Sequence, residues 1–319
     1  MTLTPLPKTP PLQQDNLPAK LKLGILDSGL MSPGKTAART IQETLLSASL
    51  TDSLGYSRYW LTEHHDPAFA WGSPEILLNE IARHTQQIRL GTAGILLFFY
   101  SPLKIAEIFR FLALIYPQRW DLGIAAGSLQ EESKIVKILC SDFVNPPESR
   151  TSRQAYYAQK VSSLVDYLER ERDRASSIWL LGTGRGNMNL AALRGTAFSY
   201  SLCHGHSKGD PQILEEYRDK FQPSQLLPTP QSNLAVAGIC AETEIEAKQQ
   251  KLLFDRSFNG TTKINVFGTP EQCREQLLEI QYRYGVEEII YLSASSTFEK
   301  RQLGYRMLAE VLNLTPLQV

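Results

Sequence analysis

The stretch IRLGTAGILLFFYSPLKIAEIFRFLALIYPQRWDLGIAA, residues 88–126, contains a strand, a helix and a second strand. The apolar run of residues 88–98 predicts the first strand, and Trp120–Ala126 predicts the second. Ser101 and Pro102 mark the helix start, because serine caps a first turn and proline fits its first position. Both strands are apolar on both faces, so we expect them in a parallel sheet that is covered on each side.

The same alternation of short apolar runs and longer amphipathic segments continues in both directions along the chain. Eight strands are predicted in this way, namely residues 21–27, 58–62, 88–98, 120–126, 178–182, 196–202, 234–240 and 286–293. Eight such strands, most of them followed by a helix, predict an α/β fold that is a (β/α)8 TIM barrel with insertions in the βα loops. An open doubly wound sheet is the alternative, but no GxGxxG motif follows the first strand.

The beginning of the chain differs from the rest, with five prolines among its first 18 residues. Proline cannot continue a helix or a central strand. We therefore expect residues 1–20 to form a proline-rich tail or linker and residues 21–319 to form one barrel domain. Barrels of this class often run to about 250 residues as one unit.

Composition excludes several classes of protein. The chain has 33 Lys+Arg and 33 Asp+Glu, so its formal net charge is zero, which argues against a nucleic-acid partner. No apolar run approaches the roughly 18 residues of a membrane span, and the N-terminus lacks a signal-peptide core. The four cysteines form no CxxC pair, so neither a disulfide framework nor a metal site is expected. We predict a cytoplasmic protein without a membrane partner.

Three polar residues, Glu63, His64 and His65, follow the second predicted strand. A barrel carries its active site at the carboxyl ends of its strands. Adjacent residues of an extended segment point to opposite sides, so one histidine is expected to face the pocket, where it can exchange a proton near neutral pH. A strand end with hydrogen-bonded structural histidines fits the same residues equally well.

Two further segments carry weaker signals. The loop GTGRGN, Gly182–Asn187, is expected to lead into a helix. The free N–H groups of this helix, together with Arg185, would suit an anion. The commoner interpretation of such a glycine-rich segment is a tight turn that binds no ligand. His204 and His206, with Glu63 or His64, form a candidate metal site of hydrolase type, but a polar loop is the commoner interpretation.

At YWLTEHH, residues 59–65, the sequence resembles the luciferase-like flavin-dependent monooxygenases of the bacterial luciferase superfamily. The resemblance covers nearly everything after residue 20. It continues in Ser73–Glu75, Ile88–Leu97, Ser101–Glu107, Tyr116–Ser128, Leu180–Gly195, Phe267–Leu277 and Gly285–Leu292. It implies the same TIM barrel as the strand pattern.

The resemblance also implies an activity. Members of this superfamily use reduced FMN, supplied by a separate flavin reductase, and O2. A C4a-peroxyflavin then inserts one oxygen atom into a small organic substrate by Baeyer–Villiger insertion, hydroxylation or N-oxidation. A carbonyl-containing or carrier-bound substrate of secondary metabolism is conceivable, and a homodimer is expected.

Site residues follow from the same resemblance, position by position. His64 matches the catalytic histidine beside the flavin, and Glu63 would orient its imidazole. Ala93 and Gly94 match a turn beneath the flavin ring, which is often a cis peptide without proline. The phosphate-binding region corresponds to Gly184, Arg185, Gly186 and Asn187.

One departure concerns the flavin phosphate. Members of the superfamily usually carry an arginine after the fourth strand, and here that position is Ala126. Arg185 is the candidate that restores the missing charge. Because a phosphate ligand is lost, a non-catalytic flavin-binding homologue stays an alternative beside the monooxygenase, and a metal-dependent barrel hydrolase is the third.

Overall fold

Ten parallel strands form one sheet in the computed structural model, which describes residues 20–127, 134–139, 149–170, 176–258 and 261–316. The strands are β1 (Lys22–Asp27), β2 (Arg58–Leu61), β3 (Arg89–Thr92), β4 (Ile95–Leu96), β5 (Trp120–Ala125), β6 (Ser176–Gly182), β7 (Ala197–Ser201), β8 (Ser232–Cys240), β9 (Ile264–Gly268) and β10 (Glu288–Ser293). Residues 1–19, most of the expected tail, lie outside the described residues.

Eight of these strands close into a barrel, in the order β10-β1-β2-β3-β5-β6-β7-β8, because β8 also pairs with β10. The predicted (β/α)8 TIM barrel is therefore confirmed. Each of the eight predicted strands has its counterpart in the ring, although the third is split into β3 and β4 at residues 93–94.

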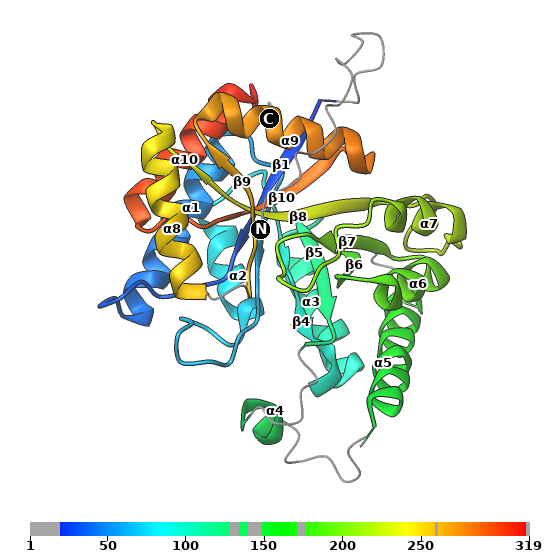
Figure 1. Ribbon diagram of the computed structural model, residues 1–319. Coiled ribbons are helices and arrows are strands. Elements are labelled where there is room, and N and C mark those ends of the chain that lie inside the picture. The colour runs from blue at the N-terminus through cyan, green and yellow to red at the C-terminus, as the bar shows by residue number, and fades with distance from the viewer. Residues whose placement is uncertain (1–19, 128–133, 140–148, 171–175, 259–260, 317–319) are drawn as a thin grey trace.

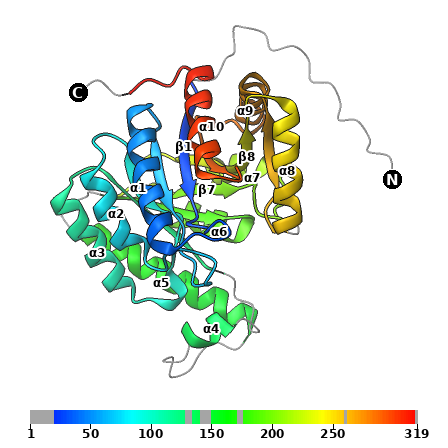
Figure 2. The same ribbon diagram turned by 90° about the vertical axis from the view of Figure 1, so that its left-hand side faces the viewer.

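The helices surround the barrel (Figures 1 and 2). They are α1 (Ala37–Ser53), α2 (Pro74–Arg83), α3 (Pro102–Ile115), α4 (Lys134–Leu139), α5 (Arg150–Arg170), α6 (Arg185–Arg194), α7 (Gln212–Lys220), α8 (Glu244–Phe258), α9 (Pro270–Tyr284) and α10 (Phe298–Val311), with a short 3-10 helix η2 at Leu97–Phe99. In Figure 1, β1 runs downwards, β8 runs nearly across the view, and α4 lies at the bottom, away from the barrel. No helix in the described part of the chain has the length and apolar character of a membrane span.

Local capping explains where several helices begin. The Ser101 side chain accepts a hydrogen bond from the Lys104 amide at the start of α3. Thr269 and Gln272 form a reciprocal capping box at the start of α9. Ser73, in contrast, makes no side-chain cap at α2, where proline at the first position fixes the helical start instead.

The strand β9 was not expected, since its residues are not among the eight predicted strands. It pairs only with β8, and the register shifts between Ala237 and Gly238. The side chain of Asn265 accepts a hydrogen bond from the Ala237 amide at this irregularity, 3.0 Å away. With Asn265 as its second residue, this five-residue strand is too short to show a clear apolar run.

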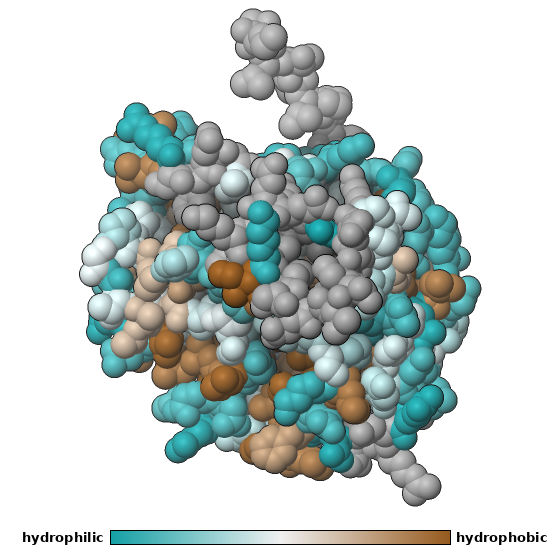
Figure 3. Space-filling model, turned by 90° about the horizontal axis from the view of Figure 1, so that it is seen from below, coloured by the Kyte–Doolittle hydropathy of each residue, from teal (hydrophilic) through white to brown (hydrophobic). Residues whose placement is uncertain are grey.

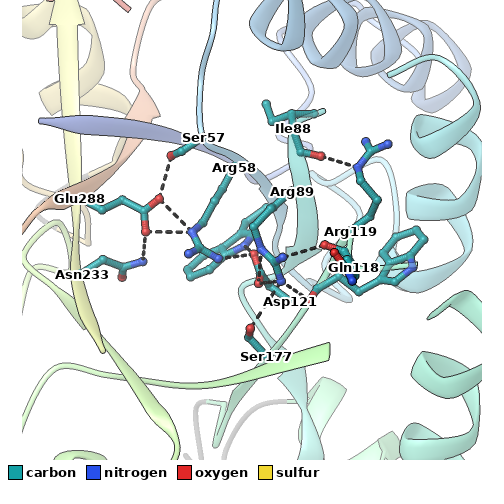
Figure 4. Close-up of polar contacts among 12 residues, drawn as sticks. Ser57, Arg58, Ile88, Arg89, Gln118, Arg119, Asp121, Ser177, Asn233 and Glu288 are labelled. Atoms are coloured by element: carbon teal, nitrogen blue, oxygen red, sulfur yellow. Dashed lines mark hydrogen bonds and ion pairs between the residues drawn. The ribbon is translucent and has the colours of Figure 1, made fainter. Parts of the chain in front are cut away.

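Opposite charges meet inside the barrel at the amino ends of its strands (Figure 4). The carboxylate of Asp121 accepts hydrogen bonds from Arg58 at 2.6 Å and from Arg89 at 2.7 Å. Arg58 also reaches Glu288 at 2.8 Å, and Asn233 donates to the same carboxylate at 3.2 Å. Burial alone would raise the pKa of Asp121, but the two guanidinium groups outweigh it and lower the pKa below its usual value. The network therefore joins β2, β3, β5, β8 and β10 by charge as well as by backbone pairing.

We expect Asp121→Asn to lower the free energy of unfolding by about 3–5 kcal/mol, because it removes the buried counter-charge of Arg89 and one of the two carboxylates that pair with Arg58. Urea unfolding followed by circular dichroism measures this. Since the pKa of Asp121 is depressed, its contribution is present above the usual value of 3.8 and is lost as the pH falls through the folded value.

The matched control is Glu287→Gln. Glu287 pairs with Lys22 at 3.5 Å on the surface, where the two side chains are 66% and 61% exposed. Such a pair contributes about 0–1 kcal/mol. Equal losses in the two variants would contradict the importance assigned to Asp121.

Candidate active site

Glu63 follows the carboxyl end of β2, and its buried carboxylate ties this strand end to neighbouring segments by hydrogen bonds. Its side chain is 1% exposed, and its Oε1 atom accepts hydrogen bonds from the Nε2 atom of His65 at 2.7 Å and from the hydroxyl of Tyr100 at 2.6 Å. Its Oε2 atom accepts one from the backbone amide of Leu96 at 2.9 Å. Three donors thus satisfy this buried carboxylate, as burial of a charge requires.

The expectation that Glu63 orients His64 is wrong. Among the described residues, the hydrogen bonds of its carboxylate go to His65, Tyr100 and Leu96. The reason is the alternation of an extended segment, which puts residues two apart on the same side. The side chains of Glu63 and His65 therefore lie on the same side of the segment, and the side chain of His64 lies on the opposite side.

His64 lies at the mouth, stacked on Phe69 with ring centroids 4.1 Å apart and planes at 21°. It keeps contact with solvent, yet the surrounding side chains desolvate its ring. Burial, and then the imidazoles of His204 and His65, lower the pKa of His64 to about 4, and Asp66 opposes them. The ring is therefore neutral at pH 7, with one nitrogen that donates and one that accepts.

His204 and His206 follow β7 and have their rings 5.7 Å apart. The Nδ1 atom of His204 lies 2.6 Å from the Ser201 hydroxyl, and the Nε2 atom of His206 lies 3.1 Å from the Thr183 hydroxyl. Burial and the neighbouring His206 lower the pKa of His204. No three histidine, cysteine or acidic side chains in the described ranges are grouped to hold a metal ion, so the metal-dependent hydrolase has no ligand set there.

Ala93 and Gly94 form a turn against the next strand of the barrel. The peptide bond between them is cis, as the resemblance implies. A Cβ atom on Gly94 would lie 2.8 Å from the backbone of Gly123 in β5, so only glycine fits there. The Ala93 amide donates to the Leu61 carbonyl at 2.7 Å, which ties the turn to β2. The sequence-predicted residues His64, Ala93 and Gly94 thus follow two strands, β2 and β3, that pair with each other.

The GTGRGN loop enters α6, as expected, with Gly184 as the residue that caps the helix. A Cβ atom added to Gly184 or Gly186 would meet nothing within 4 Å, so the loop presents bare backbone to an open space. The side chain of Asn187 donates to the Leu181 carbonyl at 2.6 Å and is engaged in closing the turn.

Arg185 points to α7 and its preceding loop. Its Nη2 atom lies 2.9 Å from Asp210 and 2.5 Å from Glu216, and its Nε atom donates to Glu216 at 3.0 Å. Two carboxylates thus compensate its charge. Ala126, at the end of β5, contributes no cation, so Arg185 would have to exchange a carboxylate for a phosphate to replace the missing arginine.

Comparison with known proteins agrees with this geometry. The sequence model of the luciferase-like monooxygenases matches residues 21–144. The uncharacterized protein YwcH of Bacillus subtilis is 30% identical over 340 residues, which cover 91% of this chain and 98% of that protein. The chain belongs to the luciferase-like monooxygenase family.

The chain is also similar to N-acetyl-S-alkylcysteine monooxygenase of Bacillus subtilis, at 27% identity over 92% of this chain and 98% of that protein. The crystal structure of apo-MsnO8 superposes with a TM-score of 0.80 at 28% identity, covering 93% of this chain and 98% of that one.

Two more distant structures share the fold alone. The oxygenating constituent of 3,6-diketocamphane monooxygenase from Pseudomonas putida, a type II Baeyer–Villiger enzyme in complex with FMN, has a TM-score of 0.71 at 16% identity and covers 92% of this chain and 97% of that one. An F420-dependent secondary alcohol dehydrogenase has a TM-score of 0.65 at 13% identity and covers 93% and 99%.

The sequence interpretation of this luciferase-like protein missed Tyr100 and the residue that holds its loop, Lys160. Tyr100 lies 37 positions from Glu63. Lys160, on α5, donates to the carbonyls of Phe98 and Tyr100 at 2.7 and 2.8 Å. Only the proximity of the βα loops at one end of the barrel indicates such partners, and no local spacing identifies them.

The neutrality of His64 gives a prediction for the five histidines of the chain. Nuclear magnetic resonance of histidine-labelled protein should place the titration midpoint of His64 at about 4. His204→Ala should raise this midpoint, because it removes one cause of the lowered pKa, but not to 6.5, because burial remains. His84→Ala, on the exposed end of α2, serves as the control and should leave it unchanged. A wild-type midpoint near 6.5 would contradict the assignment.

Proposed function

We propose that this chain is the oxygenase of a two-component system, which takes reduced FMN from a separate reductase and uses O2 to insert one oxygen atom into a small organic substrate. The observation that carries the proposal is the end of β2. There Glu63 and its three donors hold the end of the strand that precedes His64, and this strand pairs with β3, which the Ala93–Gly94 turn follows. When it is bound and reduced, FMN would supply the electrons that activate O2.

The residues present fit FMN in two places. The Ala93–Gly94 turn, which packs against Gly123 of β5, is the proposed platform for the flat ring. At α6, the bare backbone of Gly184 and Gly186 and the first N–H groups of the helix suit a phosphate. The Thr183 hydroxyl adds a donor at the same loop. Ala126 and Asn187, expected as further cofactor-binding residues, offer only contact surface, since Asn187 already donates to Leu181.

His64 is the proposed catalytic residue. Because burial keeps its ring neutral, it can hold a proton on one nitrogen and accept one on the other without a change of pH. Phe69, stacked on the ring, limits its rotation and shields one of its faces from water. The role proposed for Glu63 is to position the strand through His65 rather than to touch the reacting atoms.

Two substrate classes merit the first tests. Neutral imidazoles at the mouth, His64 and His204, favour an uncharged reacting group. Hydrophobic patches lie among hydrophilic residues on the coloured part of the face that Figure 3 shows. Carbonyl compounds follow from the expected Baeyer–Villiger chemistry. Thioethers follow from the relative that is named for N-acetyl-S-alkylcysteine.

The proposal includes two protein partners, the reductase and a second copy of the chain. α3 leaves Leu103, Phe111 and Leu114 between 47% and 64% exposed, which gives a homodimer an apolar surface to bury. We propose the cytoplasm as the compartment, because the three described cysteines are free thiols in the interior and fit a reducing environment.

The test is turnover with FMN, a flavin reductase and 18O2, with a ketone and a thioether as substrates and label incorporation read by mass spectrometry. F420 replaces FMN in a parallel assay. We expect His64→Ala to reduce oxygenation at least about 100-fold, as loss of a proton-transferring group does, with little change in FMN affinity. His84→Ala is the control. Hydrogen peroxide as the sole product of the wild type would favour the non-catalytic homologue.

Arg185→Ala tests the phosphate site separately. If Arg185 holds the phosphate, the dissociation constant of FMN should rise by about tenfold, as expected for the loss of a charge-assisted hydrogen bond, while that of riboflavin stays unchanged. Fluorescence titration measures both. An equal change in the dissociation constants of FMN and riboflavin would show that Arg185 does not bind the phosphate and serves only to pair with Asp210 and Glu216.

A further inference from the structure

Tyr100 lies between η2 and α3 and reaches back to the end of β2. Its hydroxyl donates to Oε1 of Glu63 at 2.6 Å and lies 3.3 Å from Nε2 of His65. Because His65 donates to the same oxygen, the phenol and the imidazole share one carboxylate oxygen. The other oxygen is left for the Leu96 amide in β4.

The protonation of this group is set by its surroundings. Burial, and then the hydrogen bond and charge of Glu63, raise the pKa of Tyr100 well above its usual value, and Glu75 on α2 acts in the same direction. The phenol therefore keeps its proton and acts as the donor. Burial also raises the pKa of Glu75, and the charge of Glu63 acts in the same direction.

The loop that carries Tyr100 is itself held from α5. The ammonium group of Lys160 donates to the carbonyls of Phe98 and Tyr100 at 2.7 and 2.8 Å, and it lies 4.8 Å from the ring centre of Tyr156. A side chain that satisfies two carbonyls of one loop restrains its backbone. The contacts thus run from Lys160 through Tyr100 to Glu63.

We propose that Tyr100, held by Lys160, is a positioning residue of the oxygenation site: its hydroxyl fixes Glu63 so that one oxygen binds His65 and the other binds β4. This fixes the spacing between the strand end with His64 and the Ala93–Gly94 turn. The inference rests on the proposed function for its catalytic consequence, but its structural part does not depend on a flavin.

The arrangement specifies one tautomer of His65. Nε2 faces the carboxylate and donates its proton to it, whereas Nδ1 lies beside Gly72, where an added Cβ would be only 2.9 Å away. Loss of the phenol removes one of two donors from Oε1 and allows the carboxylate to rotate. The Nε2–H proton of His65 should then exchange faster with water.

The first experiment uses the protein without flavin. In Tyr100→Phe, the exchange of the His65 Nε2–H proton, measured by nuclear magnetic resonance, should accelerate about five- to tenfold, the factor that corresponds to one lost hydrogen bond. Tyr116→Phe is the matched control, since its hydroxyl has no hydrogen-bond partner among the residues that the structure describes. Unchanged exchange in Tyr100→Phe would overturn the proposal, whether or not the wild type binds FMN.

The second experiment uses turnover. Tyr100→Phe should lower kcat about tenfold and divert O2 to hydrogen peroxide, with FMN affinity within about twofold of the wild type, as expected for a lost positioning contact. Lys160→Met should act in the same direction, and the double variant should lose little more than Tyr100→Phe alone, because both act on one loop. The proposal would be overturned if the kcat losses of Tyr100→Phe and Lys160→Met were additive in the double variant. It would also be overturned if Tyr100→Phe lowered kcat no more than Tyr116→Phe does. If Tyr100→Phe does not fold, Lys160→Met alone carries both measurements.

Discussion

Asp121 accepts hydrogen bonds from two arginines inside the barrel, where its carboxylate is fully buried. A charge in that place is tolerated only with its partners in register. A slip of β5 by one residue would turn Asp121 to the outer face of the sheet, which would take the carboxylate away from Arg89 and leave Arg58 with Glu288 alone. The network therefore selects the register of the strands that carry it as well as stabilising them. Because β10 supplies Glu288 to the same network, closure of the ring and pairing of the charges occur together.

Much of this fold could be predicted from residue pattern, because strands buried on both faces leave an apolar signature that few other structures share. The signature depends on membership in the ring. β9 lies outside the ring, pairs with β8 and has Asn265 as its second residue, so the residue pattern gave no reason to separate it from a loop. The split of the third strand at Gly94 depends on a close approach to Gly123, a contact between segments that sequence does not connect.

In the candidate site, too, some features could be predicted from the sequence, and others depend on contacts that only the fold creates. His64 could be placed from its position after β2, and the neutral state of its ring could not, because that state depends on burial and on His204. The pairing of Glu63 with His65 could have been predicted, since alternation along an extended segment puts residues 63 and 65 on one side. The pairing with Tyr100 could not, because its contact spans 37 positions. For Arg185 the sequence indicates a cation near an anion-binding loop, but only the fold brings Asp210 and Glu216 against it.

The barrel separates the charges that hold it closed from the groups proposed to do chemistry. Arg58, Arg89, Asp121 and Glu288 lie at the amino ends of strands and cancel one another, two positive against two negative. The histidines lie at the carboxyl ends, and β5 spans six residues between the two ends, about 20 Å at 3.3 Å per residue. A cancelled set of charges at that distance exerts little force on a proton at His64. The ionisation of His64 is therefore set locally, by Phe69, His204 and the strand end that Glu63 holds. Substitutions at the mouth can then change cofactor or substrate without opening the ring, which fits the occurrence of both FMN and F420 among proteins of this fold.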